Sequence, residues 1–213
     1  MMDLLPALAG QADLRLIRLP DLPVDPAVEA AWPFADWQET GRDAAGPRLP
    51  LYQMGNNRYH EGVLRLARER PGVLTLHDLV LHHLLLDRTL GRRDFPTYRD
   101  ELESDHGWVG RAAAVAKIWN AWGDAPVFAL PAHRGLLLAQ RGVLVHSRWA
   151  AEQVAEEVPE ARVREVPMGI PLPPRVDPEA GRALRQRFGL PEDAPILGSF
   201  GFQTPIKRTG VAI

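Results

Sequence analysis

Histidine and acidic side chains gather in one short stretch of the sequence. His77 and Asp78 are followed by His82 and His83, and His60 lies earlier in the chain. Imidazole and carboxylate groups are zinc ligands, and Asp78 and His82 have the four-residue spacing that places two side chains on one helix face. The stretch HDLVLHH is not a known metal signature such as HExxH. A metal-dependent hydrolase that uses these five residues is therefore kept as an alternative, and Asp78 is expected to be a helix N-cap.

His77 differs from the other histidines in its expected position. It ends the apolar run 73–77 (VLTLH), which has the length and composition of a buried strand. Ligands of open α/β sheets bind at the carboxyl ends of the strands. The sequence therefore predicts a functional role for His77, with a satisfied structural histidine as the alternative.

Two other polar turns follow expected strands. Gly55, Asn56 and Asn57 come after LPLYQM, and asparagine tolerates left-handed backbone while carrying both a donor and an acceptor. Ser147 comes after GVLVH, but it lacks the G-x-S-x-G elbow of a nucleophilic serine. We predict substrate contacts for these residues and for Asp78, with a plain turn at the glycine and asparagines and a plain N-cap at Ser147 as alternatives.

A cationic turn follows the last expected strand. Residues 195–202 (PILGSFGF) lead into a turn at Gly201, and Lys207 and Arg208 come shortly after it. The point charge of lysine beside the fork of arginine suits a diphosphate group. The turn matches neither a Walker A loop nor a GxGxxG fingerprint. A solvated surface is the alternative for these cations.

The elements around these turns alternate short apolar runs with longer amphipathic runs, which predict strands and helices respectively. The expected strands are 14–19, 49–54, 73–77, 142–146, 162–166 and 195–202, and the expected helices are 58–70, 79–89, 95–122 with a break near Gly107 or Gly110, 132–140, the run from the Ser147 cap to 157, and 177–189. Parallel strands need crossover connections, which helices supply. The sequence predicts the α/β class, with a Rossmann-like, doubly wound parallel sheet over residues 1–167.

A proline-rich connector at 168–176 separates this region from a second one. Asp177 is the expected N-cap of the next helix, with Pro178 in its first position and Gly189 at its C-terminal cap. One helix and one strand cannot form a core. Residues 177–213 are therefore expected to be the incomplete start of a second α/β domain.

Composition excludes several classes of protein. The 213 residues contain no cysteine, which excludes disulfides, thiolate metal sites and a cysteine nucleophile. The net charge of -2 gives no sign of a nucleic-acid partner. No apolar run approaches the roughly 18 residues of a membrane span.

Three tryptophans lie on the expected helix 95–122. Trp108, Trp119 and Trp122 are 11 and 3 residues apart. We expect them to pack into the core against the sheet, and stacking on a sugar is the alternative.

Five strings occur in an order that resembles the retaining GT-B glycosyltransferases of family 4, especially the bacterial ones. They are YQMGNNRYHEGVL, PGVLTLHDLVLHHLL, VLVHSRWAAEQV, VPMGIPLPP and GSFGFQTPIKR. The resemblance implies two Rossmann-like domains that face each other across a cleft. The N-terminal domain would mostly hold the acceptor, and the C-terminal domain would hold a nucleotide diphosphate sugar.

The resemblance also implies roles for single residues. His77 corresponds to a strand-end histidine that contacts the donor sugar near the reacting carbon, and Lys207 with Arg208 would neutralise the leaving diphosphate. Phe202 stands where the family often has an arginine. The family's first strand with its Gly-rich loop would precede Met1, and its E-x7-E element would follow Ile213. We therefore expect the isolated chain to have negligible transferase activity.

The partners implied are a nucleotide diphosphate sugar and an acceptor that is a glycan, a lipid-linked molecule or a small molecule. No metal, other cofactor or nucleic acid is expected. The implied location is the cytoplasm or the inner face of the membrane, with membrane contact only in a full-length protein. A non-catalytic sugar- or nucleotide-binding module is a further alternative.

Overall fold

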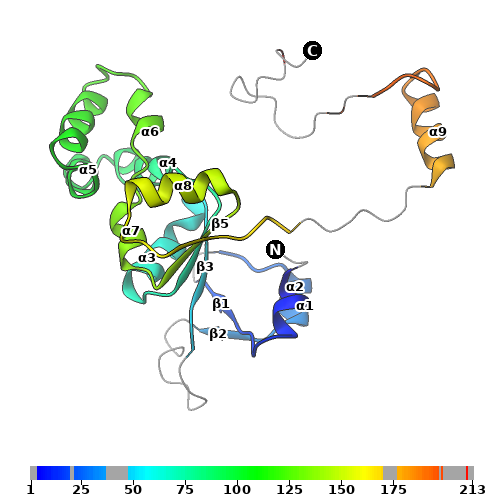
Figure 1. The fold of residues 1–213 in the computed structure, drawn as a ribbon, viewed down its shortest axis with the longest axis horizontal. Coiled ribbons are helices and arrows are strands. Elements are labelled where there is room, and N and C mark those ends of the chain that lie inside the picture. The colour runs from blue at the N-terminus through cyan, green and yellow to red at the C-terminus, as the bar shows by residue number, and fades with distance from the viewer. Residues whose placement is uncertain are drawn as a thin grey trace. The chain divides into compact units, whose positions relative to one another are not determined.

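The computed structural model describes residues 4–19, 22–36, 48–169, 177–196, 198 and 210. The chain divides into two units, Met1–Gly169 and Ile170–Ile213, and each is described by itself (Figure 1). This division lies within the proline-rich connector 168–176. The assignment of the two parts to two domains of a larger protein stays a prediction.

The first unit contains two parallel sheets. The four-stranded sheet has the order β3-β4-β5-β6, and the two-stranded sheet pairs β1 with β2. The strands are β1 (Leu16–Arg18), β2 (Phe34–Asp36), β3 (Leu51–Met54), β4 (Val73–Leu76), β5 (Gly142–Val145) and β6 (Val163–Glu165). The predicted α/β class with parallel strands is confirmed, and it is consistent with a Rossmann-like fold. Among the described residues the strands form two separate sheets, however, and the short β2 was not predicted.

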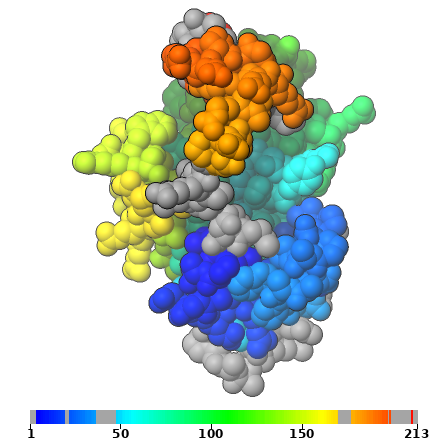
Figure 2. Space-filling model, turned by 90° about the vertical axis from the view of Figure 1, so that its right-hand side faces the viewer, coloured from blue at the N-terminus to red at the C-terminus, as the bar shows by residue number. Residues whose placement is uncertain are grey.

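Helices connect the strands and follow them closely in sequence. They are α1 (Leu4–Ala9), α2 (Pro26–Ala31), α3 (Glu61–Glu69), α4 (His82–Arg88), α5 (Phe95–Ile118), α6 (Ala125–Ala129), α7 (Arg134–Ala139), α8 (Arg148–Glu157) and, in the second unit, α9 (Pro178–Arg187), with 3-10 turns η1 (Arg58–His60) and η2 (Leu90–Arg92). Residues of α1 and α2 are neighbours on the surface of the first unit (Figures 1 and 2). In the described part of the chain, none of these helices is both long and apolar enough to pass through a bilayer.

The main core lies on one face of the four-stranded sheet. Met54, Leu74 and Val145 are fully or almost fully buried there and pack with side chains of α3, α7 and α8. Burial alternates along β3, where Leu51 is 44% exposed while Tyr52 and Met54 are buried. The opposite face is covered in part, since Thr75 of β4 lies on it and is buried.

Helix α4 begins at His82, three residues later than expected, and Asp78 is not its N-cap. The chain before it is held by the segment between α6 and α7. Leu81 N–H donates to the Pro131 carbonyl, and the Leu79 carbonyl accepts from His133 Nδ1. The Leu79 carbonyl is thereby lost to an earlier helical turn, and the Leu81 N–H is no longer free for a cap by the Asp78 carboxylate.

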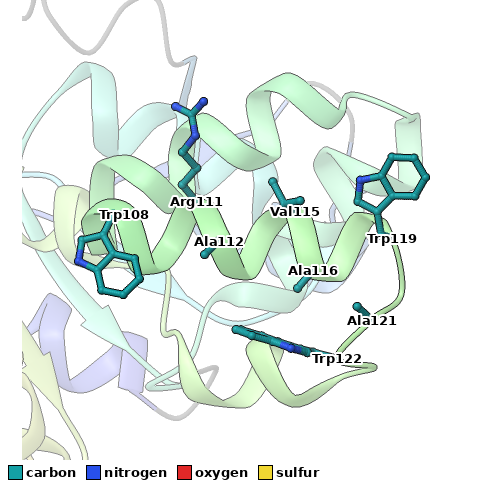
Figure 3. Close-up of a pocket in the computed structure, with 8 residues that line it drawn as sticks. All are labelled: Trp108, Arg111, Ala112, Val115, Ala116, Trp119, Ala121 and Trp122. Carbon is teal, nitrogen blue, oxygen red and sulfur yellow. The ribbon is translucent and has the colours of Figure 1, made fainter.

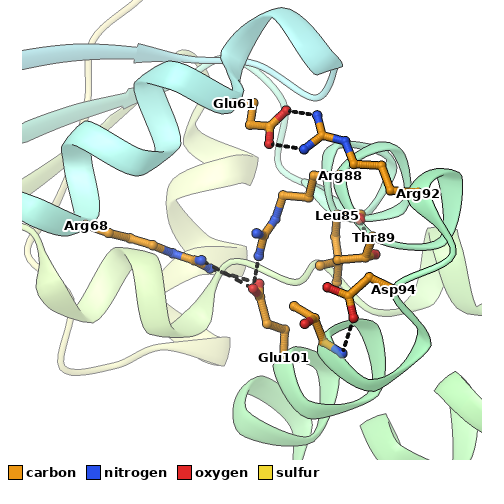
Figure 4. A network of polar contacts seen from close by, with 9 residues as sticks. Glu61, Arg68, Leu85, Arg88, Thr89, Arg92, Asp94 and Glu101 are labelled. Atoms are coloured by element: carbon orange, nitrogen blue, oxygen red, sulfur yellow. Dashed lines mark hydrogen bonds and ion pairs between the residues drawn. The ribbon is translucent and has the colours of Figure 1, made fainter.

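A network of charged side chains ties α3, α4 and α5 together (Figure 4). Arg68 of α3 and Arg88 of α4 both contact the Glu101 carboxylate on α5. Arg92 binds Glu61 with two hydrogen bonds of 2.8 and 2.5 Å. Burial lowers the pKa of Arg88 to about 10, and the neighbouring Arg68 charge adds to this.

The predicted break in the long helix is confirmed at Gly107. This residue has φ 60° and ψ −146°, and it separates two helical halves of α5. The halves close on a small second core that includes Tyr98, Leu102 and Ala114. Gly110 lies so close to the first half that a Cβ there would be 1.9 Å from the Leu102 carbonyl oxygen.

The expectation that the tryptophans pack into the core is wrong. Trp108 is 79% exposed, Trp119 is 80% exposed and Trp122 is 57% exposed. The second half of α5 buries Gly110, Ala113 and Ala114 instead. Because these small residues form the inward face, the indoles lie on the outer one.

The second unit is described chiefly through α9. Asp177 caps this helix by accepting from Glu179 N–H, and Pro178 is its first residue, as predicted. Gly189 has φ 62°, the left-handed conformation expected just after a helix end. The predicted strand 195–202 lies mostly outside the described residues.

We predict that Gly110→Ala destabilises the first unit by about 1 to 3 kcal/mol, because the new methyl group would overlap backbone that cannot easily move. The free energy of unfolding from urea titration measures this. The control is Gly62→Ala in α3, where the nearest atoms are 3.4 Å away on the flexible Leu19 side chain. It should be neutral or stabilising by up to about 1 kcal/mol. Equal stability of the two variants would contradict the close packing at Gly110.

Candidate functional site

The carboxyl ends of β4 and β5 bring two histidines together. Thr75 of β4 is paired with Leu144 of β5, so His77 and His146, each two residues further on, emerge side by side. Their rings lie 5.0 Å apart between centroids, with an angle of 28° between the planes. His77 is exposed, as a strand-end functional residue must be. The structure thus agrees with the position predicted for His77.

A chain of hydrogen bonds runs through the pair and across three strands. His77 Nε2 is 2.8 Å from Gln53 Oε1, and Gln53 Nε2 donates to Thr75 Oγ1 at 3.1 Å. On the other side, His77 Nδ1 is 3.0 Å from His146 Nε2, and His146 Nδ1 donates to the Val166 carbonyl at 3.0 Å. Both nitrogens of both rings are therefore engaged.

Counting protons along this chain shows that it has two states. With the Gln53 amide as described, Oε1 accepts from His77 Nε2–H, and His146 must donate from Nδ1 because a carbonyl only accepts. Two neutral rings would then face each other with bare nitrogens, so the bond between them requires one additional proton. If the amide is rotated, Gln53 donates to His77, and two neutral rings complete the same chain. Proton uptake by the pair is thus coupled to the orientation of Gln53.

The surroundings of His77 favour its neutral form. Partial burial of the ring lowers the pKa of His77, and positive charge on His146 or His60 would lower it further. The carboxylate of Asp78 opposes this shift. At neutral pH the rotated amide with two neutral rings is therefore the expected state.

Asn56 connects the β3 turn to helix α4. Its Oδ1 accepts from Leu84 N–H at 3.0 Å, and its Nδ2 donates to His83 Nδ1 at 3.0 Å. The backbone N–H of Asn56 donates to Asp78 Oδ2 at 2.8 Å. Both the Asn56 amide and the Asp78 carboxylate therefore connect the turn after β3 with the segment after β4. The Asp78 carboxylate accepts from the Asn56 backbone and, contrary to the prediction, does not cap α4.

Asn57 and Gly55 support His60. Asn57 Oδ1 accepts from Tyr59 N–H and from His60 Nδ1, at 3.1 and 3.0 Å. The His60 ring covers Gly55, where a Cβ would be 2.8 Å from the imidazole carbon Cε1. Burial lowers the pKa of His60. Gly55, Asn56 and Asn57 thus shape this turn, and their predicted contacts with substrate stay a prediction.

Ser147 is the N-cap of α8. Its hydroxyl accepts from Ala150 N–H at 3.2 Å. The structure thus shows the N-cap, which is the alternative to substrate contact for this residue. Ser147 directly follows His146, so the cap fixes the chain where the histidine pair emerges.

His82 is a core residue. It is fully buried, its Nδ1 donates to the Leu130 carbonyl at 2.8 Å, and its Nε2 accepts from the Tyr98 hydroxyl at 2.7 Å. Burial is the main reason that the pKa of His82 falls to about 4. Within the described ranges, which include all five residues of the hydrolase alternative, no group of three or more such side chains could hold a metal ion. The described residues therefore give that alternative no geometric support.

Three predicted site residues, Gly201, Lys207 and Arg208, lie outside the described residues. Two residues of the site were not predicted, Gln53 and His146. A signal for His146 was present, because VLTLH and GVLVH are both expected strands that end in histidine. Gln53 could have been found from its place on β3, since it faces the same side of the sheet as Thr75 and His77.

Searches with this chain found no matching family model, no similar curated protein and no similar solved structure. The interpretation of the site therefore depends on its geometry and on the sequence resemblance.

We predict that Gln53→Glu raises the pKa of His77 by about one pH unit or more, since a carboxylate accepts but cannot donate and so favours the protonated pair. The measurement is an NMR titration of the histidine ring protons. Gln53→Met, which neither donates nor accepts, should not raise the pKa. An unchanged His77 pKa in Gln53→Glu would contradict the coupling between the amide and the proton.

A second prediction concerns stability at low pH. Because the pKa of His82 falls from 6.5 to about 4 on folding, the unfolded chain binds the proton first as the pH falls. Stability linked to His82 is fully present above pH 6.5 and decreases between pH 6.5 and about 4, by about 3 kcal/mol in total. Urea unfolding at several pH values should show a shallower pH dependence for His82→Gln than for the unmutated chain. His83→Gln, which removes an exposed neighbour, should keep the original slope; an unchanged slope in His82→Gln would refute the assignment.

Proposed function

We propose that this chain belongs to a retaining glycosyltransferase that transfers a sugar from a nucleotide diphosphate sugar to an acceptor hydroxyl. One observation carries the proposal. His77 is exposed at the carboxyl end of β4 and is held there by Gln53 and His146 from the two neighbouring strands. This is where ligands bind in open α/β sheets. It is also the place that the resemblance to family 4 assigns to the donor-contacting histidine.

In the proposed reaction, positive charge develops on the sugar ring and negative charge on the leaving phosphate. Catalysis then depends mainly on hydrogen-bond donors and charges placed where charge develops. In the neutral state His77 would accept a hydrogen bond from a sugar hydroxyl at Nε2, which requires the Gln53 side chain to release that nitrogen. His146 would hold the His77 ring in place and share its proton, so we regard His146 as a positioning residue.

The remaining parts of the proposal come from the resemblance. Lys207 and Arg208 would neutralise the leaving diphosphate, Gly201 would allow close approach of the substrate, and no metal would be needed. The acceptor would be a glycan, a lipid-linked molecule or a small molecule. The proposed location is the cytoplasm, because the proposed donor, a nucleotide sugar, is used there.

The runner-up is a non-catalytic module that binds a sugar or nucleotide. The engagement of both His77 nitrogens in internal hydrogen bonds favours it, because neither nitrogen can exchange a proton with a bound molecule until Gln53 or His146 moves. Both functions predict that the protein binds a nucleotide sugar, but only the transferase also predicts that it transfers the sugar to an acceptor.

The test is transfer from a panel of nucleotide sugars by the protein in its natural length, with NMR detection of the anomeric configuration. We expect retention, and we expect His77→Ala to lower kcat by about a hundredfold or more. His146→Ala should lower kcat less and shift its pH profile, as a positioning role requires. Arg99→Gln, a surface change on α5, is the control and should leave activity unchanged.

Binding without turnover would favour the module and overturn the transferase proposal. Turnover that survives His77→Ala would remove His77 from the site.

A further inference from the structure

The second half of α5 reverses the usual arrangement of a surface helix. The fully buried residues of this half are small, Gly110, Ala113 and Ala114, while Trp108 on its outer side and Trp119 at its C-cap are about four-fifths exposed. A surface helix ordinarily turns its large apolar side chains to the core and polar ones to water. Exposed apolar patches of this kind mark interaction surfaces.

The outer face forms a groove of about 520 Å³ (Figure 3). Trp108 lies at one end and Trp119 at the other, Trp122 closes one side, and Ala112 and Ala116 form the floor. Three of the chain's six tryptophans are gathered here. We call the surface formed by Trp108, Val115, Trp119 and Trp122 the aromatic patch.

The two cations near the aromatic patch are each paired with an acid, so the surface carries little net charge and its apolar side chains determine which partner it suits. Residues 106–123 contain no carboxylate, and their two cations are Arg111 and Lys117. Arg111 pairs with Glu103 at 3.1 Å, and Lys117 pairs with Asp124 at 2.5 Å, so both acids lie outside this stretch. The patch therefore presents indoles and methyl groups with one exposed cation, Arg111, while Lys117 is mostly buried, and the flanking carboxylates of Glu103 and Asp124 are each paired with one of these cations.

Other occupants fit less well. A tryptophan buries at most about 250 Å², so the three partly exposed indoles offer about 500 Å², against about 800 Å² per partner in a stable dimer. A glycan needs hydrogen-bond partners for its hydroxyls, and Arg111 is the one charged or hydroxyl-binding side chain besides the indoles that lines the groove. Binding to a bilayer interface does not require the buried area of a stable dimer. Indoles, which have an apolar body and a polar N–H, prefer this interface.

We propose that the aromatic patch inserts its indoles into the interfacial region of a phospholipid bilayer and so holds this face of the first unit against the membrane. The helix lies along the surface and does not cross the bilayer. The inference does not depend on the proposed transferase activity. It departs from the resemblance, which implied membrane contact only in a full-length protein, because the aromatic patch lies entirely within the described first unit.

The position of the aromatic patch gives this binding a consequence for the site. Helix α6 contacts α5 and carries Phe128, which is 56% exposed. The Phe128 ring meets His83 edge-on with 5.7 Å between centroids, and His83 is bonded to Asn56 in the turn beside His77. Membrane contact through α5 would therefore bring the candidate site near molecules anchored in the lipid.

The experiment is flotation of the 213-residue chain with phosphatidylcholine vesicles, with and without phosphatidylglycerol. We expect the chain to float with both, because insertion of the indoles is the main contribution. The double variant Trp108→Ser/Trp119→Ser should bind about a hundredfold more weakly, at about tenfold for each indole. Trp149→Ser is the matched control, because Trp149 is 61% exposed but lies on α8 outside the patch, and it should bind like the unmutated chain.

Each remaining outcome overturns the proposal. These are a chain that stays in the lipid-free fraction, a double variant that binds as well as the unmutated chain, and binding that needs phosphatidylglycerol and disappears in high salt for all variants alike. Light scattering without lipid identifies a second copy as the occupant if the double variant turns a dimer into a monomer while no form binds vesicles. Circular dichroism confirms that the variants are folded, which is expected because the replaced side chains are exposed.

Discussion

The arrangement of the candidate site depends on the parallel register of β3, β4 and β5. Parallel pairing of Gln53 with Thr75, and of Thr75 with Leu144, fixes which side chains share a face of the sheet. His77 and His146 follow at the same distance beyond their paired strands, so the register alone places the two rings side by side. A shift of one residue in either strand would turn one imidazole to the helical face and break the hydrogen-bond chain.

The strand ends and the helix starts are joined by side chains that a turn prediction treats as independent. Asn56 binds the N-terminus of α4 and His83, while Asp78 binds the Asn56 backbone. The turn after β3 and the turn after β4 therefore form one connected unit. The Asp78 bond anchors the chain directly after His77 to the turn after β3, although His77 itself is exposed.

The sequence was sufficient for the parts of the fold that depend on local pattern. Apolar runs gave β4 and β5, proline and aspartate gave the start of α9, and Gly107 gave the break in α5. What it could not supply depends on tertiary contacts. The start of α4 is set by backbone bonds to a segment about fifty residues away, and the role of Asp78 is set by the turn after β3. His146 was visible as a strand end, but its pairing with His77 required the register.

The tryptophans show how one steric constraint can reverse the expected burial. Apolar spacing on a helix predicts an inward aromatic face, and that inference assumes room for large side chains. Here the approach of Gly110 to the Leu102 carbonyl leaves space only for small residues between the two halves of α5. The indoles must then lie on the outer face, where their exposure carries a cost in water. A bilayer interface would remove that cost, which is why the packing of α5 and its proposed membrane contact have one physical origin.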